Sequence, residues 1–137
     1  MKKRYKKYIN KGKYEPLHNL LFHDHGKAPL KRLLMLNNKI VSNSNIHIAA
    51  HYVRKLPKKF EKYAMPHKHN CDEVNLILSE NSKLIYEIEL GSEKYIITSP
   101  ASVFIPKGLS HCANVIKGRG IFICIVLKGE YNKSFIK

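Results

Sequence analysis

The sequence has no apolar run near the roughly 20 residues that a bilayer-spanning helix needs. No secretory apolar segment follows its basic first residues, so export is not expected. Its three cysteines are an odd number without a CxxC pair, which argues against a disulfide framework and fits a reducing cytoplasm. Serine-nucleophile, Walker-type and dinucleotide-binding patterns are also absent. These absences predict a cytoplasmic protein with no membrane segment.

Acidic residues are scarce, with 10 Asp and Glu against 25 Lys and Arg, which gives a formal charge of +15. Such an excess attracts nucleic acid, anionic lipid or anionic metabolites, or simply keeps the surface solvated. We favour the solvated surface, because no nucleic-acid motif or basic recognition helix accompanies the charge. Nucleic acid is therefore not an expected partner, and the charge mildly favours an anionic substrate.

At 137 residues, 44% of them hydrophobic, the chain is long enough for one domain with a real core. Residues 1–16 are strongly charged and end at a proline, which predicts a basic N-terminal tail. Residues 17–137 then form a single domain. Within Pro29–Leu36 the apolar spacing at positions 30, 33 and 34 predicts one short amphipathic helix.

From about residue 39 the pattern changes to short strands separated by turn signals. The predicted strands cover Ile46–Val53, Val74–Ser79, Leu84–Leu90, Lys94–Thr98, Ser102–Ile105, Cys112–Ile116 and Ile121–Leu127. No helical crossovers lie between them, so a parallel sheet is not expected. The pattern predicts an all-β sandwich or small barrel.

Three histidines and one glutamate form two clusters within this strand region. His67 and His69 are two residues apart, so on a strand they project from the same face. Glu73 begins the next strand, and His111 begins a later one, 38 residues after Glu73. Neighbouring strands lie about 4.8 Å apart, so these side chains can converge on one ion. Three imidazoles and one carboxylate suit a mononuclear divalent metal with open positions for water or substrate.

The two clusters resemble the paired motifs of the cupin family. The HxH(x)3E motif appears as His67-Lys68-His69-Asn70-Cys71-Asp72-Glu73, and the PxGxxH motif as Pro106-Lys107-Gly108-Leu109-Ser110-His111. The resemblance covers roughly residues 46–127. It implies a double-stranded β-helix, a small jelly-roll barrel with the metal inside, and it makes the metal ligands His67, His69, Glu73 and His111. We expect Fe²⁺ first, with Mn²⁺, Ni²⁺ and Zn²⁺ as alternatives.

Other polar side chains near the motifs have more than one interpretation each. Alternation from Glu73 places Asn75 on the ligand face, where it can bind a substrate, orient a ligand or be a plain polar residue at the barrel mouth. Tyr52 and Tyr86 can contact a substrate or pack in the core. Cys71 and Cys112 can ligate metal, but we favour ordinary buried thiols.

The role of four more histidines depends on which way their side chains point. In the strand before the motifs, one face carries His47, Ala49 and His51, and the other carries Ile46, Ile48, Ala50 and Tyr52. We favour the second face as the inner one, where it would form a plain apolar core. A second HxH, His23-Asp24-His25, has no partner cluster, so we favour a loop or tail-packing role for it.

The sequence therefore supports a functional hypothesis about a class of chemistry. The chain is expected to be a metal-dependent cupin enzyme, of dioxygenase, isomerase or lyase type, acting on a small anionic oxygen-bearing metabolite, with Glu73 as a candidate base. The alternative is a non-catalytic ligand-binding or regulatory module. Chains of this kind often pair, so we expect a homodimer that uses the apolar segment 29–36 or an exposed strand edge.

Overall fold

The computed structural model describes residues 3–16, 21–23 and 28–136. Its strands are β1 (Lys13–Tyr14), β2 (Lys31–Leu36), β3 (His47–Val53), β4 (Lys68–His69), β5 (Glu73–Leu78), β6 (Leu84–Leu90), β7 (Glu93–Thr98), β8 (Ala101–Ile105), β9 (His111–Gly118), β10 (Gly120–Val126) and β11 (Phe135–Ile136). Two 3₁₀ turns, η1 (Lys6–Tyr8) and η3 (Tyr131–Lys133), are the helical elements among the described residues.

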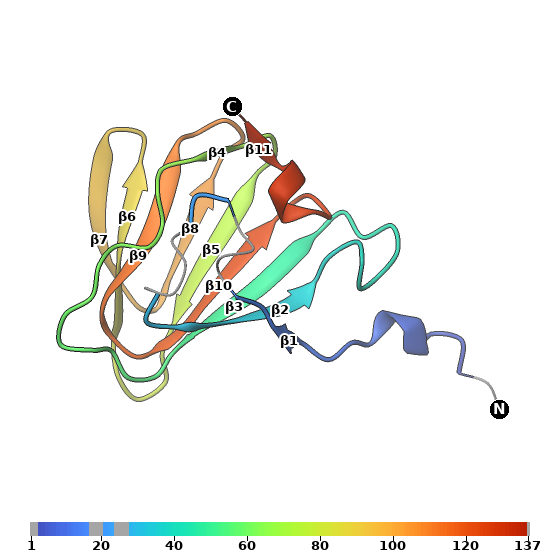
Figure 1. Cartoon of the computed structure of the whole chain (residues 1–137), viewed down its shortest axis with the longest axis horizontal. Coiled ribbons are helices and arrows are strands. Elements are labelled where there is room, and N and C mark those ends of the chain that lie inside the picture. Colours follow the sequence, from blue (N-terminus) through green and yellow to red (C-terminus); the bar gives the residue numbers. More distant parts are fainter. Residues whose placement is uncertain (1–2, 17–20, 24–27, 137) are drawn as a thin grey trace.

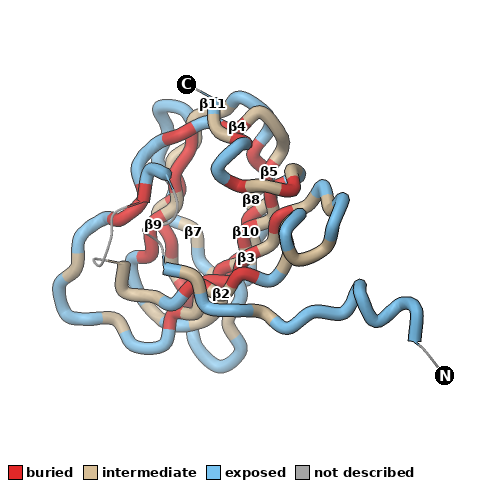
Figure 2. Tube along the Cα trace, turned by 45° about the vertical axis from the view of Figure 1, so that its right-hand side comes forward, coloured by how far each residue is buried: buried red, intermediate tan, exposed pale blue. Residues whose placement is uncertain are grey.

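The strands form three antiparallel sheets that close around one interior (Figures 1 and 2). The largest has the order β1-β2-β3-β10-β5-β8, and it faces a sheet with the order β7-β6-β9. A two-stranded sheet, β11-β4, lies at one end. Because β10 lies between β3 and β5, strands far apart in sequence are neighbours. This arrangement confirms the predicted all-β jelly-roll barrel, and every predicted strand from residue 46 onward is present within one or two residues of its expected bounds.

The predicted helix over Pro29–Leu36 is wrong, because Lys31–Leu36 form strand β2. β2 pairs with β3 on one side and with β1 on the other. Its burial alternates, with Arg32 and Leu34 inward and Leu33 half-buried on the opposite face. A short apolar run of this length fits a helix or a strand equally well by periodicity. The hydrogen bonds that β1 and β3 offer decide the outcome.

Inward-facing side chains of both large sheets fill the barrel away from the metal motifs. Ile77 of β5 and Tyr86 of β6 have no exposed surface, and Tyr86 stacks on Phe122 of β10 with ring centroids 4.5 Å apart. Figure 2 shows buried residues in β3, β9 and β10. Fully burying one such aliphatic side chain contributes about 1.5–3 kcal/mol. This core packs the two large sheets against each other.

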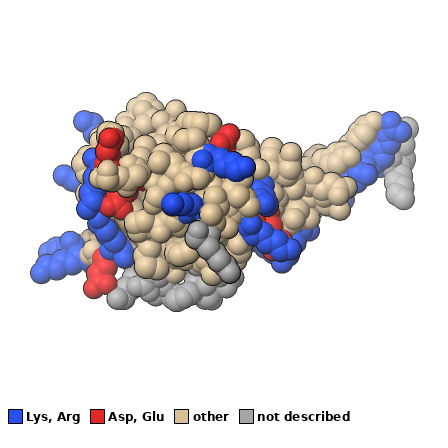
Figure 3. All heavy atoms as spheres, turned by 90° about the horizontal axis from the view of Figure 1, so that it is seen from above, with Lys and Arg blue, Asp and Glu red and all other residues tan. Residues whose placement is uncertain are grey.

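The end of the predicted tail joins the barrel. Lys13 pairs with Leu34, and the backbone N–H of Glu15 donates to the carbonyl of Arg32. Before β1 the chain extends away from the body and carries Lys and Arg side chains (Figure 3). No helix among the described residues is long and apolar enough to cross a membrane.

Candidate metal centre

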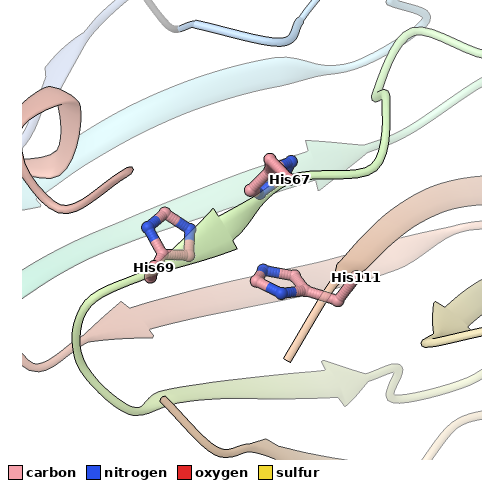
Figure 4. Close-up of side chains that lie close together, drawn as sticks. All are labelled: His67, His69 and His111. Carbon is pink, nitrogen blue, oxygen red and sulfur yellow. The ribbon is translucent and has the colours of Figure 1, made fainter. Parts of the chain in front are cut away.

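The two sequence motifs meet inside the barrel. His67 and His111 exchange two backbone hydrogen bonds, with N to O distances of 3.0 and 2.9 Å. His69 follows in β4, and its ring lies on the same side as that of His67. One ring nitrogen from each of the three histidines lies within 4.8 Å of the others, and all three side chains are buried (Figure 4). The group can hold a metal ion.

Backbone carbonyls fix the tautomers of two of these rings. Nδ1 of His67 donates to the carbonyl oxygen of Met65 at 2.7 Å, and Nδ1 of His111 donates to that of Leu109 at 2.9 Å. A carbonyl oxygen only accepts, so in both rings Nδ1 carries the proton. In the neutral ring the lone pair is then on Nε2, which is the atom available to a metal.

A side chain near the C-terminus fixes the third ring. The hydroxyl of Ser134 donates to the carbonyl oxygen of Tyr131 at 2.5 Å, which uses its single hydrogen. Ser134 Oγ therefore accepts from Nδ1 of His69, also at 2.5 Å. His69 thus presents Nε2 to the same space as the other two rings.

The carboxylate of Glu73 closes one side of the cluster. Its Oε1 lies 3.2 Å from Nε2 of His69 and 3.4 Å from Nε2 of His111. These three atoms are buried and have no hydrogen-bond partner among the described residues. Imidazole nitrogens and a carboxylate oxygen that face one another in this way form a donor set for a divalent cation. The residues present therefore fit the metal that the motifs predict.

The electrostatics place a carboxylate among imidazoles. Burial raises the pKa of Glu73, but the close approach of His111 and His69 outweighs burial and holds this pKa well below its ordinary value. Burial, together with the nearby His111, lowers the pKa of His67 to about 3. Burial also lowers the pKa of His111, but Glu73 outweighs it and leaves that pKa raised. A cation that replaced the His111 proton would keep the favourable interaction with Glu73.

Asn75 acts on the candidate ligand Glu73. It is 1% exposed, and its Nδ2 donates to Oε2 of Glu73 at 2.8 Å. This contact leaves Oε1 facing the histidines. The sequence left several roles open for Asn75. The structure shows the contact that orients a candidate metal ligand.

The two tyrosines proposed as substrate contacts lie elsewhere. Tyr86 is buried in the core against Phe122, and burial raises its pKa well above the ordinary value. Tyr52 is half-buried on the face of β3 opposite to His51. Cys112 donates from Sγ to Glu89 on the far side of β9 from His111. The structure does not bring these three residues to the histidine cluster.

The inner face of β3 corrects one sequence interpretation. His47, Ala49 and His51 are 2%, 0% and 4% exposed, whereas Ile48 and Tyr52 are half-buried on the outer face. The predicted plain apolar face therefore points outward. The histidines are tolerated inside because Arg32 of β2 donates to both of them, at 2.7 Å to His47 and 2.9 Å to His51.

A cavity of about 30 Å³ borders the cluster, which is room for roughly two water molecules. Its walls include three candidate ligands and three residues that sequence reasoning did not assign to the site: His67, Glu73, His111, His23, Arg32 and His51. A wider hollow of about 660 Å³ lies at the other end of β5 and contains none of the candidate ligands.

His23 belongs to the second HxH, for which a loop or packing role was favoured. Its Nδ1 donates to the carbonyl oxygen of Leu21 at 2.8 Å, and its ring centroid is 5.7 Å from that of His67. Burial lowers its pKa to about 4. Its partner in the motif, His25, lies outside the described residues. The histidine pair was a usable signal for His23, whereas nothing local in the sequence marks Arg32 or Ser134.

An antiparallel double-stranded β-helix with a buried histidine cluster inside its barrel is the cupin fold, and this chain has that fold. Neither the family models nor the curated proteins give a match to this sequence. The fold is therefore assigned from the structure.

Several solved structures share the fold. An RmlC-like cupin from Shewanella frigidimarina is 15% identical, with a TM-score of 0.54 over 81% of this chain and 86% of that chain. The polyketide cyclase RemF from Streptomyces resistomycificus is 14% identical, with a TM-score of 0.55 over 92% and 79%. A point mutant of oxalate decarboxylase from Bacillus subtilis is 11% identical, with a TM-score of 0.56 over 94% of this chain but 33% of that chain.

Proposed function

We propose that the protein is a metal-dependent cupin enzyme that acts on a small anionic oxygen-bearing metabolite. One divalent ion is held by four side chains, namely His67, His69, Glu73 and His111. The observation that carries the proposal is the set of buried, unpartnered atoms that face one another: Nε2 of His69, Nε2 of His111 and Oε1 of Glu73. The Nδ1 hydrogen bonds support it, because they orient the rings without any metal.

The protein supplies a preorganised, nearly closed site. Burial of the rings excludes bulk water, and the cavity beside them admits a group with two oxygen atoms. A divalent ion held by these residues would supply Lewis-acid chemistry, and iron, our first choice, would add redox chemistry with dioxygen. Glu73, whose Oε2 is held by Asn75 and whose side chain lines the cavity, is the proposed base once it detaches from the ion. The reaction is of the dioxygenase, isomerase or lyase type.

Proteins of the same fold support an enzymatic role, since the similar structures include a polyketide cyclase and an oxalate decarboxylase. Their identities of 14% and 11% carry the fold and not the substrate. The anionic substrate is supported instead by this chain's own charge of +15.

Elemental analysis of natively purified protein tests the metal site. We expect about one divalent ion per chain, and loss of it in His69→Ala and His111→Ala. His47→Gln is the matched control, because His47 is equally buried but lies outside the four ligands. Protein without metal, or metal retained in both ligand variants, would reject the proposal.

Deleting residues 1–11 separates the enzyme from the regulatory alternative. The deletion leaves β1 in place, so the barrel keeps all its described strands. For the enzyme, turnover of a panel of small hydroxy and keto acids survives this deletion and disappears in His69→Ala. A function that is lost with the tail while metal content is unchanged would favour the non-catalytic module.

We propose a homodimer, supported by the apolar residues exposed on the outer face of the large sheet, which include Met35, Leu78 and Phe104. A monomer in sedimentation at micromolar concentration would reject it.

We propose a cytoplasmic location, supported by three free cysteines. Cell fractionation tests it.

A further inference from the structure

A buried arginine shares the cavity with the candidate metal ligands. Arg32 is 3% exposed and forms part of the same wall as Glu73 and His111. Its Nε donates to the carboxylate of Glu15 at 2.9 Å, and its guanidinium lies 5.6 Å from the ring centre of Tyr131. A charged group this deeply buried is costly unless its donors are matched by acceptors.

The remaining partners of Arg32 are neutral rings. Nη1 donates to Nε2 of His51 at 2.9 Å and Nη2 donates to Nε2 of His47 at 2.7 Å. A guanidinium has donors only, so both Nε2 atoms accept and both rings keep their proton on Nδ1. Those two Nδ1 atoms are buried with no partner among the described residues. Around Arg32, hydrogen-bond donors therefore outnumber hydrogen-bond acceptors among the described residues.

Counted over the described residues, the charge around the cavity would also be unbalanced with a divalent ion in the candidate metal site. A divalent cation and Arg32 together carry one positive charge more than Glu73 and Glu15 remove. Each terminal nitrogen of Arg32 has a second hydrogen beyond the one used by a histidine. Among the described residues these second hydrogens have no partner, so an anion that entered the cavity would meet N–H groups and a positive field at once.

We propose that Arg32, with His51 beside it, binds the carboxylate of the substrate in this cavity. The inference rests on the proposed metal site and deepens it: the substrate is a small carboxylic acid. A carboxylate is planar and matches the fork of a guanidinium. The cavity of about 30 Å³ admits only a small group beside the candidate ligands, and the planar fork of Arg32 matches a carboxylate better than a tetrahedral phosphate.

Calorimetry on the metal-loaded protein tests this assignment, with glycolate as the probe and inorganic phosphate as the comparison anion. We expect glycolate to bind, and Arg32→Lys to weaken it at least tenfold with metal content unchanged, because lysine keeps the charge but loses the fork. Arg119→Lys is the matched control, since Arg119 is exposed at the far end of the barrel. Phosphate binding as tightly as glycolate would overturn the carboxylate class.

Wild-type protein gives a second readout that does not depend on a variant's folding. In zinc-loaded protein with ¹⁵N-labelled arginine and histidine, saturating glycolate should shift the Nε–H resonance of Arg32 and the ring resonances of His51, but not those of Arg119. Bound glycolate without these shifts, or equal affinity in Arg32→Lys, overturns the role of Arg32 while the metal site stands. Protein that takes up no metal overturns the proposed function itself, and the metal content of the same samples shows which has failed.

Discussion

Ser134 accepts a hydrogen bond from Nδ1 of His69 at 2.5 Å, although 65 positions separate the two residues in the sequence. The contact exists because β11 pairs with β4, and Phe135 lies opposite His69. The segment that ends the described chain thus orients a candidate metal ligand and fixes its tautomer. This segment therefore contributes to the candidate site together with the motif residues.

This relationship predicts the effect of Ser134→Ala. Without its acceptor, the ring of His69 is free to rotate and to change tautomer, so metal affinity should fall about 10- to 100-fold. Competition with a chromophoric chelator measures it. Ser79→Ala is the control, because the Ser79 hydroxyl bonds to Ser82 and Arg119 at the other end of β5. Equal affinities in both variants would contradict the orienting role.

Asn75→Leu should weaken metal binding by about 10-fold, because Oε2 of Glu73 loses its donor and the carboxylate is free to turn. Asn81→Leu, at an exposed turn, serves as the comparison. The same chelator competition applies. If Asn75 contacts substrate instead, metal affinity will stay unchanged and only glycolate binding will weaken.

Metal affinity should fall as the pH falls. The raised pKa of His111 means that the ring keeps its proton to a higher pH than an ordinary histidine, whose pKa is 6.5. Lowering the pH through that raised value loads a proton onto the ring and displaces the ion. His67, with a pKa of about 3, does not contribute in this window. The dissociation constant of the metal should therefore rise as the pH is lowered from about 8 to about 6. A dissociation constant that stays the same over this range would contradict the prediction.

Ile77→Ala should lower the free energy of unfolding by about 2–5 kcal/mol, because Ile77 is fully buried between the sheets. Ile96→Ala removes the same atoms from a side chain that is 62% exposed and should cost no more than about 0.5 kcal/mol. Urea unfolding of the two metal-free variants gives the comparison. Similar losses in both would mean that the barrel interior is not the main core.

Strand positions after residue 46 were predictable because alternation and turn residues agree there. Leu84–Leu90, for example, alternates in sequence and in burial, and it forms β6 at the predicted bounds. Segment 31–36 was not predictable, since its apolar spacing fits a helix as well as a strand. Only its position between β1 and β3 supplies the ladder hydrogen bonds that make it β2.

The motif histidines His67, His69 and His111 come together as the sequence predicted, and Glu73 lies against two of them. The residues that surround these candidate ligands could not be predicted from the sequence. Whether His51 or Tyr52 faces inward follows from the register of β3 against β10, where His51 lies opposite Phe122. No periodicity within the strand distinguishes the two faces, because both are apolar enough to be buried.

The sequence by itself determined the strand pattern after residue 46 and the donor set of the candidate metal site, because both depend on spacings of a few residues. Tertiary structure alone decided which groups surround that donor set. Arg32 lies beside His47 and His51, and Ser134 beside His69, through strand pairings between distant segments. Such pairings depend on how whole sheets pack against each other, and no local pattern encodes that.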